Sequence, residues 1–325
     1  METLVKRLIA ALALAVLAFA SGTSFAQYPV KPVRIVVPYP PGGTTDILAR
    51  LVATRLTDKL GQTFVVENRP GAAGAIGSQA VAKSAPDGYT LVMGTVSSHG
   101  INSALYKSLP YDPVKDFAPV TNVASTPNVI TVNPDVPVKN LGELLKLARE
   151  KPGKLNFGST SQGGSPHMSA ELLKMMTGVD MVHVPYKGAG PMLADLIGGQ
   201  VQIGFDNLPS SMSHIRSGKV RAIAVTTPAR WPGAPEIPTV AESGVAGYEV
   251  SGWFGLLAPA GTPKPVIDVL YAALSEILKQ PEVQKQMLEL GAAPVGNAPD
   301  AFGRQIAGEV EKWKKVVATT GVKAE

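Results

Sequence analysis

The chain alternates between short apolar runs and amphipathic stretches, with loops of small residues between them. Val33–Val37 is a β-branched apolar run typical of a buried strand. Pro38–Gly43 ends that run, and Thr44–Asp46 supplies residues that commonly cap a helix. Apolar positions then recur three or four residues apart up to Leu56, and Gly61 follows as a helix stop. This segment therefore predicts a strand, a loop and a helix in that order.

The same order repeats along most of the chain. We expect further strands at residues 63–67, 89–94, 129–132, 155–158, 181–184, 201–205 and 220–226, and one that ends at 256–257. We expect further helices at residues 73–84, 141–149, 166–177, 191–197 and 210–217, and three near the C-terminus at about 265–279, 281–290 and 300–319. Strands that alternate with helices of this length are typical of parallel βαβ units, so the pattern predicts an α/β fold.

Two stretches rich in Pro, Thr and Ala, Val123–Asn128 and Thr226–Pro238, are candidate crossings between two lobes. A chain that crosses at both builds one lobe, visits a second and returns to the first. We expect residues 27–125 and 228–325 in lobe 1 and residues 126–227 in lobe 2. Two lobes joined by two strands form a hinge with a ligand cleft between them.

Residues 1–26 have the order of features typical of a secretory signal peptide. Lys6-Arg7 precedes the apolar run Leu8–Ala20, and Ser24–Ala26 places small residues at the cleavage site. The apolar run of 13 residues is short for a membrane anchor, which needs about 20. We therefore expect cleavage after Ala26 and export of the mature chain.

Composition removes several classes of function. The 325-residue chain has no cysteine, which excludes disulfides, thiol catalysis and cysteine-ligated metal clusters. Its four histidines form none of the spacings typical of a zinc site, so we expect no metal and no cofactor. The net charge is +5, but the basic residues are scattered among acidic ones, so we expect no nucleic-acid partner. A mildly positive protein is compatible with anionic small solutes.

Several loops between a predicted strand and a predicted helix carry residues suited to binding an anion. In Tyr39–Asp46, two prolines precede two glycines and two threonines, which allows close backbone approach and supplies hydroxyl donors. Ser159–His167 has the same position and offers serine hydroxyls before the next helix. In open α/β sheets, ligands bind at the carboxyl ends of strands, where helix N-termini present unpaired N–H groups. The loops therefore favour a carboxylate ligand.

Motifs of common enzymes are missing from the sequence. It contains no G-x-S-x-G nucleophile elbow and no G-x-x-x-x-G-K-[ST] phosphate loop. Ser165 and His167 are only two residues apart, which does not imply a nucleophile and base pair. A clamp of backbone and hydroxyl groups binds a ligand without altering it, so we expect transport rather than catalysis.

Taken together, the loops resemble one known family. The motifs that carry the resemblance are Tyr28-Pro29, Tyr39–Asp46, Val66–Gly77, Pro86–Leu91, Leu109–Phe117, His183–Gly190 and Trp253–Leu256. Across essentially all of the mature chain, the sequence is similar to the Bug receptors, the periplasmic solute-binding components of tripartite tricarboxylate transporters. The resemblance implies a type II periplasmic-binding-protein fold. In that fold, two α/β lobes joined by a two-strand hinge close on a small carboxylate or dicarboxylate.

Carried over by position, the resemblance also implies a ligand site with residues from both lobes. The expected ligand-binding residues are Tyr39, Gly42, Gly43, Thr44, Thr45, Ala72, Ala73, Ser97, Ser161, Ser165, Tyr186 and Asp206. Two roles are open for Asp206: it binds a ligand amine or a bridging water, or it caps the helix after Pro209. The implied partners are a small organic acid and the subunits of a membrane permease, and we expect a monomer.

Two other functions could use the same cleft. One is a hydrolase, which needs a positioned base. The other is a sensor that reports the ligand to a membrane signalling kinase. Turnover of a carboxylate ester would support the hydrolase, and loss of signalling without loss of uptake would support the sensor.

Overall fold

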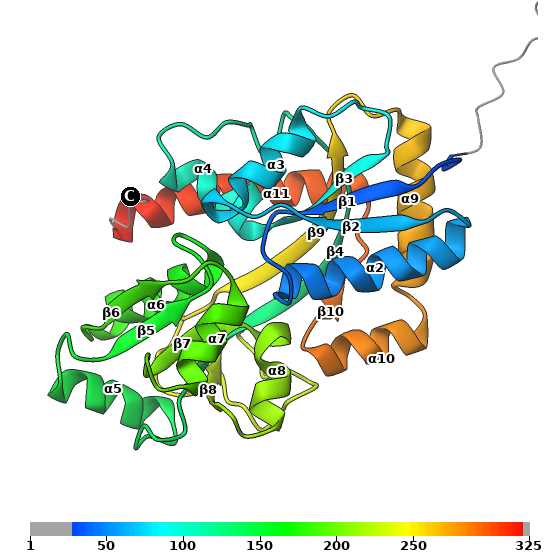
Figure 1. The fold of residues 1–325 in the computed structure, drawn as a ribbon. Coiled ribbons are helices and arrows are strands. Elements are labelled where there is room, and N and C mark those ends of the chain that lie inside the picture. The colour runs from blue at the N-terminus through cyan, green and yellow to red at the C-terminus, as the bar shows by residue number, and fades with distance from the viewer. Residues whose placement is uncertain (1–27, 321–325) are drawn as a thin grey trace, which may run out of the picture. The chain divides into compact units, whose positions relative to one another are not determined.

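The computed structural model describes residues 28–320, and Figure 1 shows how the elements in them are arranged. From Lys31 onward these residues form one compact unit, to which all the elements below belong. The signal peptide predicted for residues 1–26 lies outside the described residues. Among the helices that are described, none combines the length and the apolar character that crossing a bilayer requires.

The first lobe is built on a mixed sheet. Its strands follow the order β2-β1-β3-β9-β4, with β10 also paired to β4. Strand β1 is parallel to β2 and β3, whereas β9 is antiparallel to both β3 and β4. The bounds are β1 (Val33–Val37), β2 (Phe64–Asn68), β3 (Thr90–Thr95), β4 (Phe117–Val132), β9 (Ser251–Pro259) and β10 (Ala293–Pro294).

The second lobe is built on a smaller sheet that shares β4 with the first. Its order is β4-β7-β5-β6, and β8 pairs with β4. Strand β5 is parallel to β6 and β7, whereas β4 is antiparallel to β7 and β8. The bounds are β5 (Asn156–Ser159), β6 (Val182–Pro185), β7 (Ile203–Asn207) and β8 (Arg221–Val225). Parallel strands joined through helices in both lobes confirm the predicted α/β class.

Helices pack around both sheets, close to the positions that the sequence predicted (Figure 1). In the first lobe they are α2 (Thr44–Leu60), α3 (Ala75–Ala82), α4 (Asn102–Leu105), α9 (Lys264–Ile277), α10 (Pro281–Leu290) and α11 (Pro299–Thr320). In the second lobe they are α5 (Leu141–Glu150), α6 (Ser165–Thr177), α7 (Ala189–Ile197) and α8 (Leu208–Arg216). Three short elements were not predicted: helix α4, a 3₁₀ turn, η1 (Ala72–Gly74), and a π-helical turn, η2 (Ser97–Ile101).

Helix α11 packs against the first lobe through an apolar stripe. The buried residues of the stripe are Phe302, Ile306, Val310 and Trp313. The Phe302 ring meets the Trp253 ring of β9 edge to face, with centroids 5.3 Å apart. A β-carbon added at Gly255 of β9 would lie only 2.1 Å from the Phe302 ring. The stripe is therefore part of the core of the first lobe.

Strand β4 runs through both lobes and forms half of the hinge. Its first part, Phe117–Pro127, pairs with β9, and its last part, Asn128–Val132, pairs with β7. The predicted crossing at Val123–Asn128 therefore lies inside a continuous strand. The adjacent antiparallel strand β9 is the second half of the two-strand hinge.

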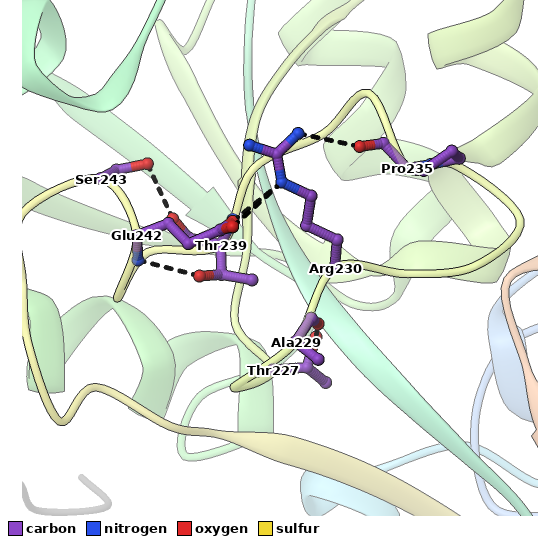
Figure 2. Close-up of polar contacts among 7 residues, drawn as sticks. All are labelled: Thr227, Ala229, Arg230, Pro235, Thr239, Glu242 and Ser243. Carbon is purple, nitrogen blue, oxygen red and sulfur yellow. Dashed lines mark hydrogen bonds and ion pairs between the residues drawn. The ribbon is translucent and has the colours of Figure 1, made fainter.

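The segment after β8 is folded against the second lobe, although the sequence predicted a crossing at Thr226–Pro238. Thr239 bridges to the end of β8, and Figure 2 shows the Arg230 guanidinium paired with the Glu242 carboxylate. Glu242 also accepts the N–H of Thr239 at 2.8 Å. The chain enters the first sheet again at Ser251, where β9 begins. The lobe boundaries stay a prediction, and these pairings favour a second boundary near Ser251.

Candidate functional site

A cavity of about 40 Å³ lies between the two lobes of the compact unit. Eight of the twelve predicted ligand-binding residues line it: Tyr39, Gly43, Thr44, Thr45, Ser97, Ser161, Ser165 and Asp206. Nine further residues line the cavity that are not among the expected ligand-binding residues: Pro40, Thr95, Val96, Thr160, Pro166, Gly188, Ala189, Asn207 and Phe254. Loops from opposite lobes therefore face one shared space.

Four helices begin at the wall of this cavity. Helix α2 starts there from the first lobe, and helices α6, α7 and α8 start there from the second. The first N–H groups of a helix have no acceptor within the helix, and the helix dipole adds partial positive charge at that end. The convergence of these N-termini makes the cavity suited to a negatively charged group.

The first-lobe loop is held in place by Asp46. Its carboxylate accepts the N–H of Gly42 at 3.0 Å, Arg50 Nε at 2.9 Å and Asn68 Nδ2 at 2.9 Å. Burial raises the pKa of Asp46, but these hydrogen bonds outweigh burial and hold the pKa below its usual value. The predicted capping role of Asp46 agrees with this geometry. Gly42 itself does not line the cavity but a neighbouring groove, and its N–H is taken by Asp46.

Tyr39 lines the cavity from the first lobe. Its hydroxyl lies 2.9 Å from Thr95 Oγ1 and 3.3 Å from the carbonyl oxygen of Ala73. Burial raises the pKa of Tyr39, so its hydroxyl stays protonated. Ala72 and Ala73 do not line the cavity; both have left-handed backbones, with φ of 45° and 49°. The Ala73 carbonyl oxygen instead accepts the hydrogen bond from Tyr39 and so helps to position its side chain.

Tyr186 lies in the second lobe but also outside the cavity lining. Its hydroxyl donates to Asp195 Oδ2 at 2.7 Å. Burial, together with the nearby Asp195 carboxylate, raises the pKa of Tyr186 to about 12. The neighbouring Gly188 and Ala189 line the cavity in its place. The sequence offered a signal for them, because Gly188–Pro191 is another start of a helix rich in small residues and proline.

The second-lobe loop is anchored to the hinge strand and to the first lobe. Asn128 of β4 donates through Nδ2 to the carbonyl oxygen of Ser165 at 3.2 Å and to Ser169 Oγ at 2.6 Å. The N–H of Ser165 donates across the cleft to Ser97 Oγ at 3.1 Å. The site is therefore coupled to both the hinge and the opposite lobe.

Two histidines that do not line the cavity form hydrogen bonds with the second-lobe loop. The rings of His167 and His183 stack with centroids 3.8 Å apart and an interplanar angle of 11°. His167 Nδ1 accepts the N–H of Gly163 at 2.9 Å, and His183 Nε2 lies 2.7 Å from Ser159 Oγ. Burial lowers the pKa of His167 to about 4 and that of His183 to about 3, so both are neutral at pH 7. His167 is therefore not paired with Ser165.

Asp206 lies at the end of β7 and is 1% exposed. Its Oδ2 accepts the hydroxyls of Ser210 at 2.7 Å and Ser211 at 2.8 Å, and its Oδ1 accepts the N–H of Asn207 at 2.7 Å. Burial raises the pKa of Asp206 to about 6. Its described partners all belong to the start of α8, which favours the capping role. Among residues 28–320, no group of three or more acidic or histidine side chains is arranged to hold a metal ion.

Comparison with known proteins places this geometry in a family. A family model described as "Tripartite tricarboxylate transporter family receptor" matches residues 48–322. Protein BugT of Bordetella pertussis (strain Tohama I) is 39% identical over 305 residues, which is 94% of each chain.

Two solved structures with the same fold contain a dicarboxylate. R. palustris Rpa4515 with adipate is 42% identical, has a TM-score of 0.89, and matches 91% of this chain and 99% of that one. MatC from Rhodopseudomonas palustris with bound malate is 36% identical, has a TM-score of 0.83, and matches 89% of this chain and 100% of that one. These matches confirm the predicted periplasmic-binding-protein fold and the resemblance to the Bug receptors. The chain belongs to the tripartite tricarboxylate transporter family of receptors.

Proposed function

We propose that this protein is an exported periplasmic receptor that captures a small carboxylate or dicarboxylate and delivers it to a tripartite membrane permease. The observation that carries the proposal is the convergence of four helix N-termini, from both lobes, on one cavity. Such an arrangement favours an anion and encloses it when the lobes are together. The relatives with adipate and malate hold dicarboxylates, which supports the same ligand class here.

The energies of these contacts are sufficient for useful affinity. A hydrogen bond to a charged group contributes about 1.5–3 kcal/mol net. Micromolar binding needs about 8 kcal/mol, so three or four such bonds together with burial reach that range. The cavity of about 40 Å³ exceeds the roughly 10–15 Å³ that one water requires, so a carboxylate group fits between the lobes.

We further propose that the cleft binds without catalysis. The Ser165 hydroxyl donates to Asn128 Oδ1 at 3.4 Å, and His167 Nδ1 is occupied by the N–H of Gly163. A hydrolase would need a free base next to its nucleophile. The sensor hypothesis has no specific contact in its favour.

A screen of organic acids tests the ligand class. We expect adipate, malate and related dicarboxylates to raise the melting temperature, because a ligand that binds only the folded state stabilises it by mass action. Calorimetry then gives the affinity, and high-performance liquid chromatography checks that the acid is recovered unchanged. Stabilisation by neutral amides of the same acids and not by the acids themselves would contradict the proposal.

The donors at the start of α2 give a matched pair of variants. Gly43→Val places a branched side chain near Pro40 and Ala189, where an added β-carbon already lies 3.9 and 4.0 Å from their atoms. We expect calorimetry to show at least about a tenfold loss of affinity for the acid found in the screen, roughly one hydrogen bond to a charged group. Gly308→Val is the control, since an added β-carbon at Gly308 meets no atom within 4 Å. Equal affinity in both variants would count against the site.

A further inference from the structure

A pair of hydrogen bonds joins the lobes beside the cavity. Thr44 at the start of α2 belongs to the first lobe, and Ser210 in the first turn of α8 belongs to the second. Their hydroxyl oxygens lie 3.1 Å apart, and the N–H of Ser210 donates to Thr44 Oγ1 at 3.2 Å. Thr44 is 4% exposed and Ser210 is 7% exposed, so this link is shielded from water. Opening the cleft must break it.

Asp206 determines which hydroxyl donates in this link. The Ser210 hydroxyl has two acceptors in its own lobe, Asp206 Oδ2 at 2.7 Å and the Asn207 carbonyl oxygen at 2.9 Å. An ionised carboxylate only accepts hydrogen bonds and is the stronger acceptor of the two, so the hydroxyl directs its hydrogen to Asp206. The Ser210 oxygen is then an acceptor for the Thr44 hydroxyl. Thr44 Oγ1 is in turn free to accept the Ser210 N–H. Each of the two residues thus donates once and accepts once across the cleft.

The contacts of Asp206 within its own lobe argue against a primary role in holding the ligand. Both of its oxygens accept hydrogen bonds from Asn207, Ser210 and Ser211. A carboxylate at the wall of an anion site would also repel an anionic ligand. A role in positioning other side chains accounts for a carboxylate in the wall of this cavity.

We propose that Asp206 is a positioning residue for closure of the cleft, because it orients Ser210 so that Ser210 and Thr44 link the two lobes. This inference rests on the proposed function, since closure retains a ligand that the cleft has captured. Asp206 thereby acts on how long the ligand stays, through Ser210, rather than on which ligand is chosen.

The absence of cysteine from the sequence permits a direct measurement of closure. Cysteines introduced at Lys83 in the first lobe and Lys219 in the second, both exposed, carry nitroxide labels. Electron–electron double resonance then reports the distance between the lobes with and without adipate. Stopped-flow fluorescence on the unlabelled protein gives the rates of adipate association and dissociation.

We expect Asp206→Asn and Ser210→Ala each to reduce the short-distance population. Each is expected to raise the dissociation rate by about tenfold, the effect of losing one bond to a charged group, with little change in the association rate. The double variant is expected to show no larger effect than either single variant, because both changes break one chain of contacts. Ser211→Ala is the control: it removes a donor to Asp206 that makes no contact across the cleft, and its dissociation rate is expected to stay within about threefold of the wild type.

With adipate present, two results would overturn the inference. One is additive loss in the double variant. The other is loss of adipate binding in Asp206→Asn with the distance distribution unchanged, which would make Asp206 a ligand contact. Ser210→Ala keeps the test open if Asp206→Asn does not fold. If the wild type binds neither adipate nor malate, the dicarboxylate proposal fails. The distances measured without acid still decide the positioning role, which an unchanged distribution in both variants would overturn.

Discussion

At the scale of single residues, His167 shows how a side chain can serve a binding loop without facing the ligand. Its neutral Nδ1 accepts the Gly163 N–H, and its ring stacks on His183. Protonation would turn that acceptor into a donor facing the Gly163 N–H and would place an uncompensated charge in a buried site. The stacking of His167 had no signal in the sequence, because its partner His183 lies 16 positions away along the chain.

The shifted pKa of His167 predicts a pH dependence of stability. Burial lowers this pKa from 6.5 to about 4, so between those values the unfolded chain binds a proton that the folded chain does not. The free energy of unfolding therefore falls as the pH falls through this window, by about 3 kcal/mol from His167 at most. Urea unfolding at pH 7 and about pH 4.5 measures the fall. We expect a smaller fall in His167→Gln, and an equal fall would refute the assignment.

Some residues of the site could be predicted from local sequence signals and others could not. Gly43, Thr44 and Thr45 could be predicted because a strand, a Gly-Gly turn and a helix start are visible in the sequence. Gly42 and Tyr186 do not line the cavity: the Gly42 N–H donates to Asp46, four residues on, and the Tyr186 hydroxyl donates to Asp195, nine residues on. Type of residue alone does not reveal which donors remain available.

At the scale of elements, helices were predicted more fully than strands. Caps and apolar periodicity are local signals, and helix α10 begins and ends where the sequence indicated. Only the last four residues of β4 were predicted as a strand, because Pro119, Pro127 and several polar residues interrupt the pattern. The strand accepts them through shifts in register, including one between Pro119 and Thr121. Pairing with β9, which lies far along the chain, stabilises the part of β4 that the local pattern does not predict.

The contact between β9 and α11 gives a prediction about packing. Gly255→Ala places a β-carbon 2.1 Å from the Phe302 ring and 3.0 Å from the carbonyl oxygen of Thr121. Such overpacking costs about 1–3 kcal/mol, so we expect a lower urea midpoint. Gly308→Ala on α11 meets no atom within 4 Å and is expected to be neutral or stabilising. Partial recovery in Gly255→Ala with Phe302→Leu would identify the clash as the cause, and unchanged stability in Gly255→Ala would refute it.

At the scale of the whole compact unit, the two lobes meet through surfaces that depend on glycine. A β-carbon at Gly188 would lie 3.0 Å from Pro40 of the first lobe. A β-carbon at Gly163 would lie 2.3 Å from Leu105 of the first lobe. Side chains at these positions would hold the lobes apart, so the structure represents a state in which the cleft is closed. Neither contact could be predicted from the sequence, where both glycines are explained by loop conformation alone.

A wedge in the cleft tests whether closure accompanies binding. Ala189 is buried in the cavity wall, and Ala189→Trp places a large ring between the lobes. We expect small-angle scattering of this variant to show no compaction with adipate, and calorimetry to show loss of binding. Pro191→Trp is the control, because Pro191 is exposed on the same helix and lines neither the cavity nor the neighbouring groove; we expect it to behave as the wild type. Normal compaction in Ala189→Trp would argue that the ligand binds elsewhere.

The sharing of β4 by both sheets limits how receptors of this kind can be recombined. A hybrid that takes its second lobe from a relative must be spliced inside a strand, between Pro127 and Asn128, and again next to Ser251, where the chain re-enters the first sheet. Junctions placed in the loops before or after β4 would mix parents within one hydrogen-bonded ladder. Exchange of ligand preference between relatives should therefore succeed only when both splice points leave each hydrogen-bonded ladder to a single parent.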